Sequence, residues 1–525
     1  MVMLTQCKVQ VTIKLCLCVL LMNTAVVLRG QNIIPKPQRQ VLMTGSFILN
    51  NATQLNVDPA FLSEASFLTG RLLDQTGFQL QQTKGDAKSQ KTIVIRKAAL
   101  NKGKEAYQLT VTPKEIVIEA NDAAGIFYGC ISLLQLLPVA NTSGLSEIPV
   151  QAINITDQPR FAWRGLMLDV SRTFMPVAYL KKTLDRMAFY KLNVLHLHMS
   201  DDQGWRVPIK ALPQLEAKAT HFDSSYHEPK EYEGYYTTAD ISELVKYAES
   251  LHVEIVPEIE SPGHSHAALF AYPELSCTGN VVPVYPFFSG PSVTNDVFCV
   301  GNPGSQQFFK AAIDEVAQAF PSKYLHLGGD EVPREAWQQC PKCQSLVKSA
   351  GLKNTSELQG YFMQQLREDV ISNKKRPVAW DEILHDNRFL TKDWVIMSWT
   401  GSKPGWEAAS KGYDVVMTPT SHMYFDYGYD ATNSRKLFSF DPLEGCPDSS
   451  KVAKHILGIQ ANFWSHIDRT QSKIDYQLYP RLLALAERAW SDEGNKDYED
   501  FRRRRDYHRD WLQKMTVKYF SGDFN

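Results

Sequence analysis

The chain has 525 residues, 44% of them hydrophobic, which suffices for a large buried core and more than one domain. Its formal net charge of -1 offers no electrostatic basis for nucleic acid or an anionic membrane surface as a partner. Aromatic residues make up 11% of the chain, so rings are available both for a core and for the lining of a binding site.

The N-terminus has the pattern of a signal peptide. Two lysines precede a mostly apolar run over residues 15–28, and Arg29-Gly30-Gln31 follows it. The run is shorter than the roughly 20 apolar residues of a membrane span, and Asn23 and Thr24 interrupt it. We expect residues 1–30 to be removed and the mature chain to be soluble and exported to a secreted, periplasmic or lysosome-like location. An uncleaved anchor is the alternative.

Six cysteines remain after the predicted signal peptide. Cys277 and Cys299 bracket a loop rich in Pro, Gly and Ser, which predicts a disulfide between them. Cys340 and Cys343 form a C-x-x-C motif, for which a local disulfide, a redox pair or half of a zinc site are the alternatives. A disulfide is favoured because the sequence contains no second C-x-x-C. Four N-x-S/T sequons predict a glycoprotein if the host glycosylates; they begin at Asn51, Asn141, Asn154 and Asn354.

Residues 31–157 are predicted to form a small N-terminal α+β domain. Strand-like runs cover Thr92–Arg96, Tyr107–Thr112 and Glu115–Glu119. An apolar helical pattern follows over Ala123–Leu137, and Pro138 ends it. The segment that begins at Asp157 has the turn-forming composition of a linker.

Residues 158–525 are predicted to form a (β/α)₈ TIM barrel, an α/β fold. Eight short apolar runs recur: Gly165–Ser171, Val194–Asp201, Val253–Glu260, Tyr324–Glu331, Pro377–Glu382, Trp394–Thr400, Asp414–Thr420 and Ile456–Trp464. Helical patterns separate them over Val177–Lys191, Thr238–Leu251, Ser305–Phe320, Thr355–Asn373 and Trp406–Lys411. Eight strands alternating with helices favour a barrel. A doubly wound open sheet is less favoured because no glycine-rich phosphate turn follows the first strand.

Polar and aromatic residues stand at the carboxyl ends of these predicted strands, where a barrel carries its active site. They are Asp169, Arg172, His198, Asp201, Glu258, His264, Asp330, Glu331, Trp380, Asp381, Trp399 and Trp464. Capping of the following helices explains some of the aspartates, but it explains neither the tryptophans nor the histidines. The pattern therefore predicts one mouth that binds a polar ring compound.

The sharpest motif is Gly328-Gly329-Asp330-Glu331. Neighbours in an ideal strand point to opposite faces, so both carboxylates reach one site only where the strand ends and the chain turns. Glycines let a ligand approach the backbone. Adjacent carboxylates also separate each other's pKa values, so that one holds a proton near neutral pH, as a general acid requires. A metal site and a solvated loop end are the alternatives.

Three segments resemble the family 20 glycoside hydrolases, the β-N-acetylhexosaminidases: His196–Arg206, Pro257–His264 and His326–Glu331. Three more extend the resemblance: Arg164–Arg172, Trp380–Glu382 and Tyr479–Glu487. The resemblance covers essentially the whole mature chain. It implies the same pairing of a small N-terminal domain with a catalytic barrel.

The resemblance also implies substrate-assisted, retaining hydrolysis, an exception to the usual two-carboxylate scheme. The 2-acetamido oxygen of the sugar attacks the anomeric carbon, and an oxazolinium ion forms. Glu331 is expected to act as acid/base, and Asp330 to orient the acetamide and stabilise its developing charge. Asp201 and His264 resemble a pair that tunes the acid/base. The expected substrate-binding residues are Arg172, Trp380, Trp399, Tyr424, Asp426, Trp464 and His466, although core packing is the alternative for each tryptophan.

Two positions depart from the family pattern and leave the sugar preference open. Where the family usually has Glu, two residues after the last tryptophan of the box, this chain has His466. A neutral imidazole still accepts a hydrogen bond from a sugar hydroxyl, but a weaker one. In the segment before His264, Glu260 replaces Asp and is one methylene longer.

The resulting hypothesis is an exo-acting β-N-acetylhexosaminidase on terminal GlcNAc or GalNAc, including chitin fragments, without cofactor or metal. A related enzyme with a sulfated or disaccharide donor is the second hypothesis, and a non-catalytic glycan-binding protein is the third. The expected partner is a glycan substrate, with no nucleic acid and no membrane span after signal removal. A homodimer is left open.

Overall fold

The computed structural model describes residues 32–82, 91–100, 102–140, 142, 144–290 and 296–524. The predicted signal peptide and the sequon at Asn141 lie outside these residues. The chain forms two compact units. Unit 1 comprises the chain up to Arg160 with Trp490–Thr516 and Phe524, and unit 2 comprises Phe161–Ala489 with Val517–Asp523.

The C-terminal stretch Trp490–Thr516 groups with unit 1, whereas the sequence predicts it within the barrel domain. Specific hydrogen bonds explain this grouping. The Trp490 indole donates to Asp157 at 3.0 Å, and the Arg504 guanidinium donates to the carbonyl oxygen of Ile33 at 3.1 Å. These partners are more than 300 residues apart in sequence, so the chain pattern does not predict the pairing.

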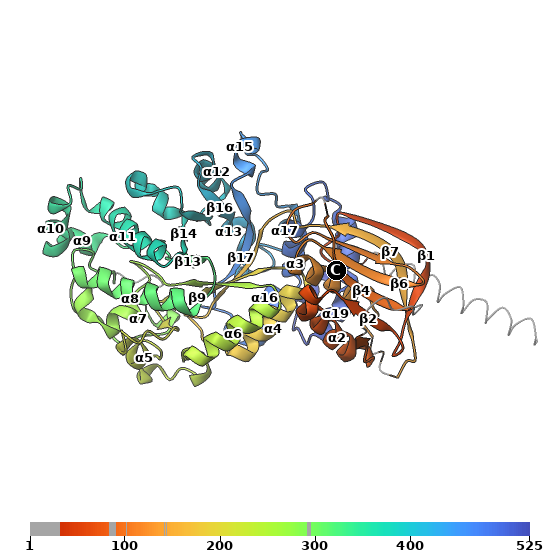
Figure 1. Cartoon of the computed structure of the whole chain (residues 1–525). Coiled ribbons are helices and arrows are strands. Elements are labelled where there is room, and N and C mark those ends of the chain that lie inside the picture. Colours follow the sequence, from red (N-terminus) through yellow and green to blue (C-terminus); the bar gives the residue numbers. More distant parts are fainter. Residues whose placement is uncertain are drawn as a thin grey trace, which may run out of the picture. The chain divides into compact units, whose positions relative to one another are not determined.

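Unit 1 is a seven-stranded mixed sheet with helices packed against it (Figure 1). The spatial order is β1-β7-β5-β6-β4-β2-β3. The strands are β1 Arg39–Leu49, β2 Gln54–Val57, β3 Gln81–Gln82, β4 Thr92–Lys97, β5 Tyr107–Val111, β6 Glu115–Ala120 and β7 Ile148–Asp157. The helices are α2 Leu62–Thr76, α3 Ala123–Leu136, α18 Tyr498–Tyr507 and α19 Arg509–Lys514. The predicted strands at β4, β5 and β6 and the predicted helix α3 are confirmed.

Unit 2 is a closed barrel of eight parallel strands in the order β8-β9-β12-β13-β14-β15-β16-β17. The strands are β8 Trp163–Asp169, β9 Val194–His198, β12 Glu254–Glu258, β13 Tyr324–His326, β14 Arg376–Trp380, β15 Val395–Ser398, β16 Asp414–Met417 and β17 Ile456–Phe463. All eight predicted strands are confirmed. All eight end before their predicted carboxyl boundary, so many of the reactive residues stand in the loops that follow.

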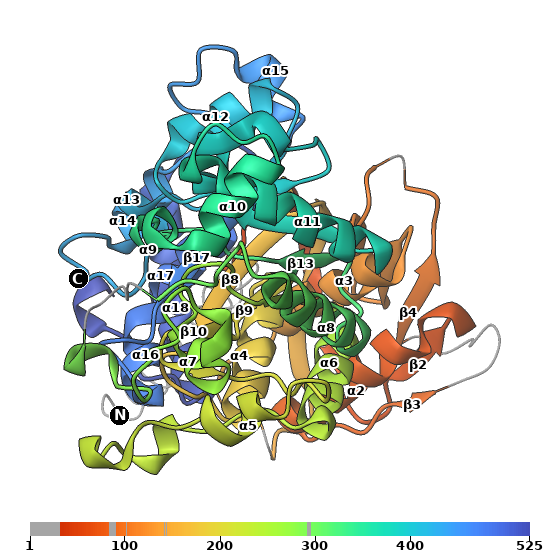
Figure 2. The same cartoon turned by 90° about the vertical axis from the view of Figure 1, so that its left-hand side faces the viewer.

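Helices surround the strands, and Figure 2 looks onto that arrangement. The main barrel helices are α4 Val177–Phe189, α6 Thr238–Ser250, α8 Pro303–Ala319, α11 Leu358–Ser372, α12 Ser402–Ser410, α16 Gln471–Leu478 and α17 Arg481–Trp490. Shorter helices occupy the loops: α5 Gln214–Lys218, α7 His266–Ala271, α9 Glu335–Gln339, α10 Pro341–Ser349, α13 Thr420–Met423, α14 Ser434–Ser439 and α15 Ser449–Ala453. A two-stranded hairpin, β10 Ser200–Asp201 with β11 Gly204–Trp205, follows β9.

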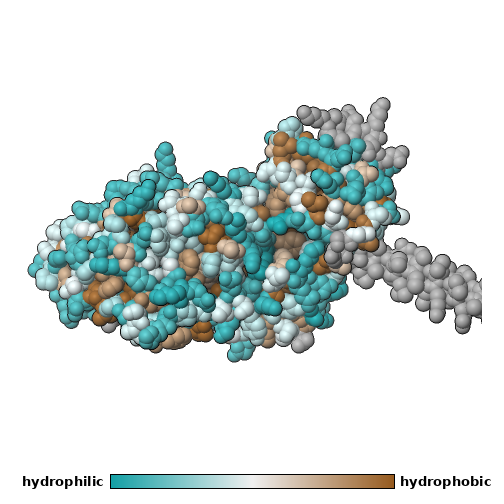
Figure 3. Space-filling model, turned by 90° about the horizontal axis from the view of Figure 1, so that it is seen from below, coloured by the Kyte–Doolittle hydropathy of each residue, from teal (hydrophilic) through white to brown (hydrophobic). Residues whose placement is uncertain are grey.

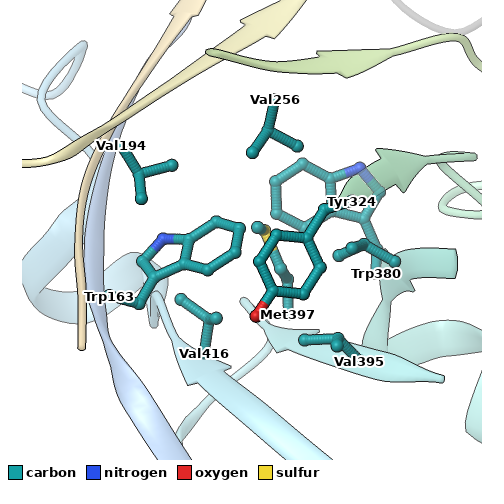
Figure 4. Close-up of a cluster of buried hydrophobic side chains, with 9 residues drawn as sticks. Trp163, Val194, Val256, Tyr324, Trp380, Val395, Met397 and Val416 are labelled. Atoms are coloured by element: carbon teal, nitrogen blue, oxygen red, sulfur yellow. The ribbon is translucent and has the colours of Figure 1, made fainter. Parts of the chain in front are cut away.

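Bulky side chains fill the interior of the barrel, so it is a packed core and not a pore. Figure 4 shows side chains from several strands converging on one another. The Trp163 and Tyr324 rings meet edge to face with centroids 5.0 Å apart. Trp399 and Trp464 pack against this cluster from the side that carries the polar strand ends. The hydrophobic cluster therefore supports the end of the barrel at which a ligand would bind.

The surface shows no membrane-spanning element in the part of the chain that is described. None of its helices is long and apolar enough to cross a bilayer. On the face drawn in Figure 3, hydrophobic residues form small patches scattered among hydrophilic ones.

The predicted Cys277–Cys299 disulfide is not formed in the structure. Both residues are free thiols, and so are Cys340 and Cys343, for which a local disulfide is the favoured prediction. Instead the four sulfur atoms gather in one cluster, each within 4.8 Å of the others. The tertiary structure brings together two pairs that the sequence treats separately.

Candidate active site

A cavity of about 290 Å³ opens at the carboxyl ends of the barrel strands. Eleven residues line it: Arg172, His264, Phe287, Asp330, Glu331, Trp399, Tyr424, Asp426, Tyr427, Trp464 and His466. Nine of these are predicted site residues, from the loops after six different strands. The barrel thus brings these nine residues together around one cavity, because the carboxyl ends of parallel barrel strands share one face.

The chain turns sharply after β13, as the Gly328–Glu331 motif predicts. Gly328, Gly329 and Glu331 all have positive φ, of 67°, 98° and 45°. A side chain at Gly328 would overlap the Glu260 carboxylate, and one at Gly329 would lie 2.7 Å from Ile383. The glycines are thus required by neighbouring protein atoms, and not by a ligand as the sequence suggests. The turn lets two adjacent carboxylates face one cavity.

Asp330 forms the buried floor of the cavity. Its side chain is 11% exposed, and Oδ2 lies 3.7 Å from His264 Nε2. None of the described residues hydrogen-bonds to Oδ1, which is buried. Burial raises the pKa of Asp330 to about 7, although the nearby His264 opposes this shift. An unpartnered buried carboxylate oxygen facing a cavity is suited to accept a hydrogen bond from a bound ligand.

Glu331 stands at the rim, with a side chain that is 46% exposed. Its Oε2 lies 3.5 Å from His264 Nε2, and this interaction lowers the pKa of Glu331. Its backbone N–H donates to the Glu382 carboxylate at 2.8 Å, which holds the strained turn in place. The Asp330 carboxylate is therefore buried and the Glu331 carboxylate is half-exposed, and such different environments allow the two groups different roles in catalysis.

Asp201 connects His264 to Arg172. Its Oδ1 lies 3.3 Å from His264 Nδ1, and its Oδ2 lies 2.8 Å from Arg172 Nη2. Burial would raise the pKa of Asp201, but Arg172 and His264 hold it well below its usual range. Burial would conversely lower the pKa of His264, yet Asp201 raises it well above the ordinary value. The predicted Asp201–His264 pair is thus an ion pair, and His264 in turn contacts Glu331.

Arg172 is held by two carboxylates behind the cavity. It contacts Asp201 at 2.8 Å and Asp169 at 3.4 Å. Its guanidinium carbon lies 4.8 Å from the ring centroid of Trp464. Its buried Nε has no hydrogen-bond partner among the residues that the structure describes. This donor remains available for a ligand hydroxyl.

Beneath the cavity, Glu258 organises three buried histidines. His198 Nδ1 lies 2.6 Å from one carboxylate oxygen and His196 Nε2 lies 3.1 Å from it, whereas His326 Nδ1 lies 2.7 Å from the other. His198 also contacts Asp201 at 2.8 Å. Glu258 is therefore a support and not a ligand-binding residue, although the strand-end pattern places it in the mouth.

A metal at the Asp330–Glu331 pair is the competing interpretation. Clusters of histidines and carboxylates that are close enough to hold an ion do occur in this region, such as Asp201, Asp202 and His264. Neither Asp330 nor Glu331 belongs to such a cluster within the described ranges. The geometry of the pair therefore favours proton transfer and hydrogen bonding over ligation.

Aromatic rings form one wall of the cavity. Trp399 stacks on Tyr424 with ring centroids 6.1 Å apart, and Tyr424 lies 6.2 Å from Trp464. Trp380 differs from its prediction as a wall residue. It is buried in the barrel core, is absent from the cavity lining, and contacts the wall through Trp464 at 6.2 Å.

Tyr424 and Asp426 both face the cavity because residues two apart in extended backbone share a face. The backbone at Tyr424 pairs with Asn462, and the N–H of Phe425 donates to the Asn462 carbonyl at 2.7 Å, which ties this segment to β17. Burial and the charge of Asp330 raise the pKa of Tyr424 well above its usual value, so the phenol stays a donor. Burial raises the pKa of Asp426 to about 7.

His466 lines the far side of the cavity. Burial and the charge of Arg172 lower the pKa of His466 to about 4, so the imidazole is neutral near pH 7. Its ring packs against Phe287 with centroids 4.7 Å apart. The second departure, Glu260, is buried against Gly328 and does not line the cavity.

Three residues of the site are absent from the sequence-based prediction of site residues: Phe287, Tyr427 and Glu382. Tyr427 and Phe287 line the cavity, but both come from irregular loops in which one aromatic residue carries no periodic signal. Glu382 stands beside the predicted Trp380, and its role in binding the Glu331 backbone depends on tertiary structure. In the sequence, Glu382 ends a predicted strand and belongs to the resemblance segment Trp380–Glu382.

Comparison with known proteins gives one consistent result. Residues 161–493 match the family model described as Glycosyl hydrolase family 20, catalytic domain, and residues 30–158 match Glycosyl hydrolase family 20, domain 2. The β-hexosaminidase of Porphyromonas gingivalis is 37% identical over 91% of this chain, which spans 63% of that protein. The β-hexosaminidase of Vibrio furnissii is 33% identical over 87% of this chain and 76% of its own.

Among solved structures, the exo-β-N-acetylglucosaminidase of Vibrio harveyi in complex with N-acetylglucosamine superposes with a TM-score of 0.83. It is 29% identical, and the match covers 93% of this chain and 78% of that one. The similarity therefore extends over both units and not over the barrel alone.

Proposed function

Because this chain belongs to glycosyl hydrolase family 20, we propose that it is an exo-acting β-N-acetylhexosaminidase that removes terminal GlcNAc or GalNAc from glycans or chitooligosaccharides. The observation that carries the proposal is the pairing of buried Asp330, with its unpartnered Oδ1, and half-exposed Glu331 in one cavity. The cavity volume, about 290 Å³, lies at the low end of the roughly 300–1,000 Å³ of small-molecule sites, which suits one sugar ring and exo action.

In the first step, the acetamide of the bound sugar lies on the Trp399–Tyr424 side of the cavity. Its N–H donates to Asp330 Oδ1, and the Tyr424 hydroxyl donates to its carbonyl oxygen. That oxygen attacks the anomeric carbon while Glu331 donates a proton to the departing oxygen. The ionised Asp330 then stabilises the positive oxazolinium in a site shielded from water.

In the second step, Glu331 takes a proton from water, and the water oxygen attacks the anomeric carbon. The oxazolinium opens to the free acetamide, and the proton now on Glu331 restores the starting state. Two inversions give net retention. General acid and base assistance of this kind is worth on the order of 10²–10⁴ in rate.

The carboxylate pair must hold one proton, and binding must move it to Glu331. In the free protein the higher pKa belongs to Asp330. An acetamide N–H donated to Asp330 stabilises its ionised form and lowers its pKa. The leaving group covers Glu331 and raises its pKa by desolvation. Substrate binding thus favours the catalytic arrangement.

We predict a bell-shaped pH dependence of kcat/KM. The singly protonated pair is the active form, so activity falls as pH rises through about 7, where the pair loses its last proton. Activity also falls on the acid side, below the ordinary glutamate pKa, where both carboxyls are protonated. In Asp330→Asn the alkaline limb moves to lower pH, because Glu331 alone then sets it. An unchanged alkaline limb in that variant contradicts the assignment.

The direct test compares chromogenic β-GlcNAc, β-GalNAc and β-glucosides. Both acetamido sugars are expected to be cleaved, whereas the glucoside, which lacks the acetamide nucleophile, is expected to be at least about 10³-fold poorer. A thiazoline derived from GlcNAc is expected to inhibit tightly, as a mimic of the oxazolinium. Absence of cleavage of both acetamido sugars refutes the proposed function, and equal cleavage of the glucoside refutes the mechanism.

An altered donor is the second candidate function, and His466 favours it. This neutral side chain replaces an anionic one of the family pattern, and it lines a small side cavity together with Arg172 and Arg469. We predict that His466→Glu lowers kcat/KM for 6-sulfated GlcNAc glycosides several-fold more than for the unsulfated sugar. The physical reason is charge repulsion in a partly buried pocket. Parallel changes for both sugars would favour the unsulfated donor.

Export by the N-terminal segment remains a prediction, which N-terminal sequencing of the mature protein checks.

A further inference from the structure

Cys277, Cys299, Cys340 and Cys343 form a cluster, here called the cysteine cluster, beside the active-site loops. Cys299, Cys340 and Cys343 are buried, and Cys277 is half-buried. Cys277 follows the short helix Pro273–Leu275, Cys299 precedes α8, and the other two begin α10. The loop after β12 and the loop after β13 thus meet at sulfur atoms.

The spacing of the sulfur atoms matches one tetrahedral ion. The Sγ–Sγ distances are 3.8 Å for Cys277–Cys343, 3.7 Å for Cys299–Cys343 and 3.6 Å for Cys299–Cys340. A tetrahedron with zinc–sulfur bonds of about 2.3 Å has sulfur–sulfur edges of about 3.8 Å. Two separate disulfides would instead draw the sulfurs into two close pairs, and no such pairing is present in the cluster.

The backbone around the cluster supports bound thiolates. The N–H of Gly301 donates to the Cys343 sulfur. A side chain at Gly301 would overlap the backbone of Lys342 and Cys343, so only glycine allows this approach. Cys340 stands at the N-cap position of the nine-residue helix α10, whose N-terminal amides favour negative charge, and Lys342 lies nearby. Donors of this kind are what a metal-bound thiolate requires.

We propose that the cysteine cluster is a structural zinc site with four thiolate ligands. Four cysteines and no open position are typical of structural rather than catalytic zinc, and thiolate ligands in a tetrahedron select zinc. Two of its ligands, Cys277 and Cys299, stand on either side of Phe287, which lines the active-site cavity. It also anchors the chain nine residues after Glu331, at Cys340. Zinc therefore holds two loops of the active site in position without touching substrate.

The test uses the full mature chain, purified without chelator. We expect about one zinc per chain by elemental analysis, and release of that zinc to a chromogenic chelator when an organomercurial titrates the thiols. Cobalt supplied during expression is expected to give the intense visible bands of tetrahedral thiolate coordination. A chain without metal, whose denatured mass is lower by four hydrogens because two disulfides have formed, overturns the proposal. These measurements need only the wild-type protein.

Variants then locate the site. Cys343→Ser is expected to lower the zinc content at least about tenfold, whereas Cys446→Ser, outside the cluster, leaves it unchanged. Equal zinc in both variants also overturns the proposal. Release of zinc from wild-type protein is expected to raise KM several-fold while kcat stays within about twofold, since Phe287 lines the cavity but takes no part in the proposed proton transfers. This kinetic arm rests on the proposed hydrolase function, whereas the zinc count does not, so the two can fail separately.

Discussion

Replacing Glu331 with Gln is expected to reduce kcat for a β-GlcNAc glycoside with a poor leaving group by about 10²–10⁴. The amide neither donates a proton to the departing oxygen nor accepts one from water. The fold is expected to persist, because the side chain is 46% exposed and the turn is held by the backbone bond to Glu382. Steady-state kinetics with a thermal unfolding measurement checks both expectations.

The same variant also has a diagnostic rescue. With a leaving group that needs no proton, the first step proceeds, and azide then attacks the oxazolinium without help from a base. A β-glycosyl azide is therefore the expected product. Glu335→Gln is the matched control, since Glu335 is exposed at the start of α9, and it should retain wild-type kinetics. Equal losses in the two variants would remove Glu331 from the mechanism.

Replacing Asp330 with Asn is the second large effect, with kcat expected to fall by about 10²–10³. The neutral amide cannot stabilise the positive oxazolinium, and it cannot accept the acetamide N–H in the same way. Azide is expected to restore little activity, because the substrate's own acetamide still occupies the attacking position. Strong rescue with an α-glycosyl azide as the product would show that Asp330 is itself the nucleophile, and the substrate-assisted scheme would fall.

Asp201→Asn distinguishes transmission of charge from direct chemistry. Asp201 contacts His264 and Arg172 but does not line the cavity. Its loss removes the charge that raises the His264 pKa, and His264 in turn holds the Glu331 pKa down. The Asp201 charge also raises the Glu331 pKa directly, but this effect is smaller than that of His264. The acid limb of the pH profile is therefore expected to move upward. A uniform loss of activity at every pH would indicate a structural role only.

Two residues of the candidate site have a strained backbone, and they lie in two different loops at the rim of the barrel. Glu331 and His264, whose side chains lie 3.5 Å apart, both have positive φ. Such backbone conformations persist only where surrounding contacts enforce them, and strain of this kind clusters at functional sites. The proposed zinc site would stabilise the far ends of these two loops.

Much of the fold follows from local sequence patterns. Eight apolar runs alternate with helical patterns. Because each run is apolar throughout, it indicates a strand buried on both faces, and the sequence predicts the barrel without any known contact. The same rule predicts the site, since carboxyl strand ends share one face. For this reason the sequence predicts Arg172, Asp330 and Trp464 together, although they are distant in the chain.

Only the tertiary structure decided the properties that depend on distances between atoms of different loops. Burial raises the pKa of Asp330, and His264 lowers the pKa of Glu331. The spacing of residues in the sequence encodes neither effect. Trp380 belongs to the core and not to the cavity wall, because a tryptophan at a strand end can face either way. The sequence alone determined most of the side chains that gather at the mouth, since the apolar pattern of each strand and the polar residues at its end are local properties. The partners of those side chains, and the union of two cysteine pairs in one cluster, were decided by packing between segments far apart in the chain.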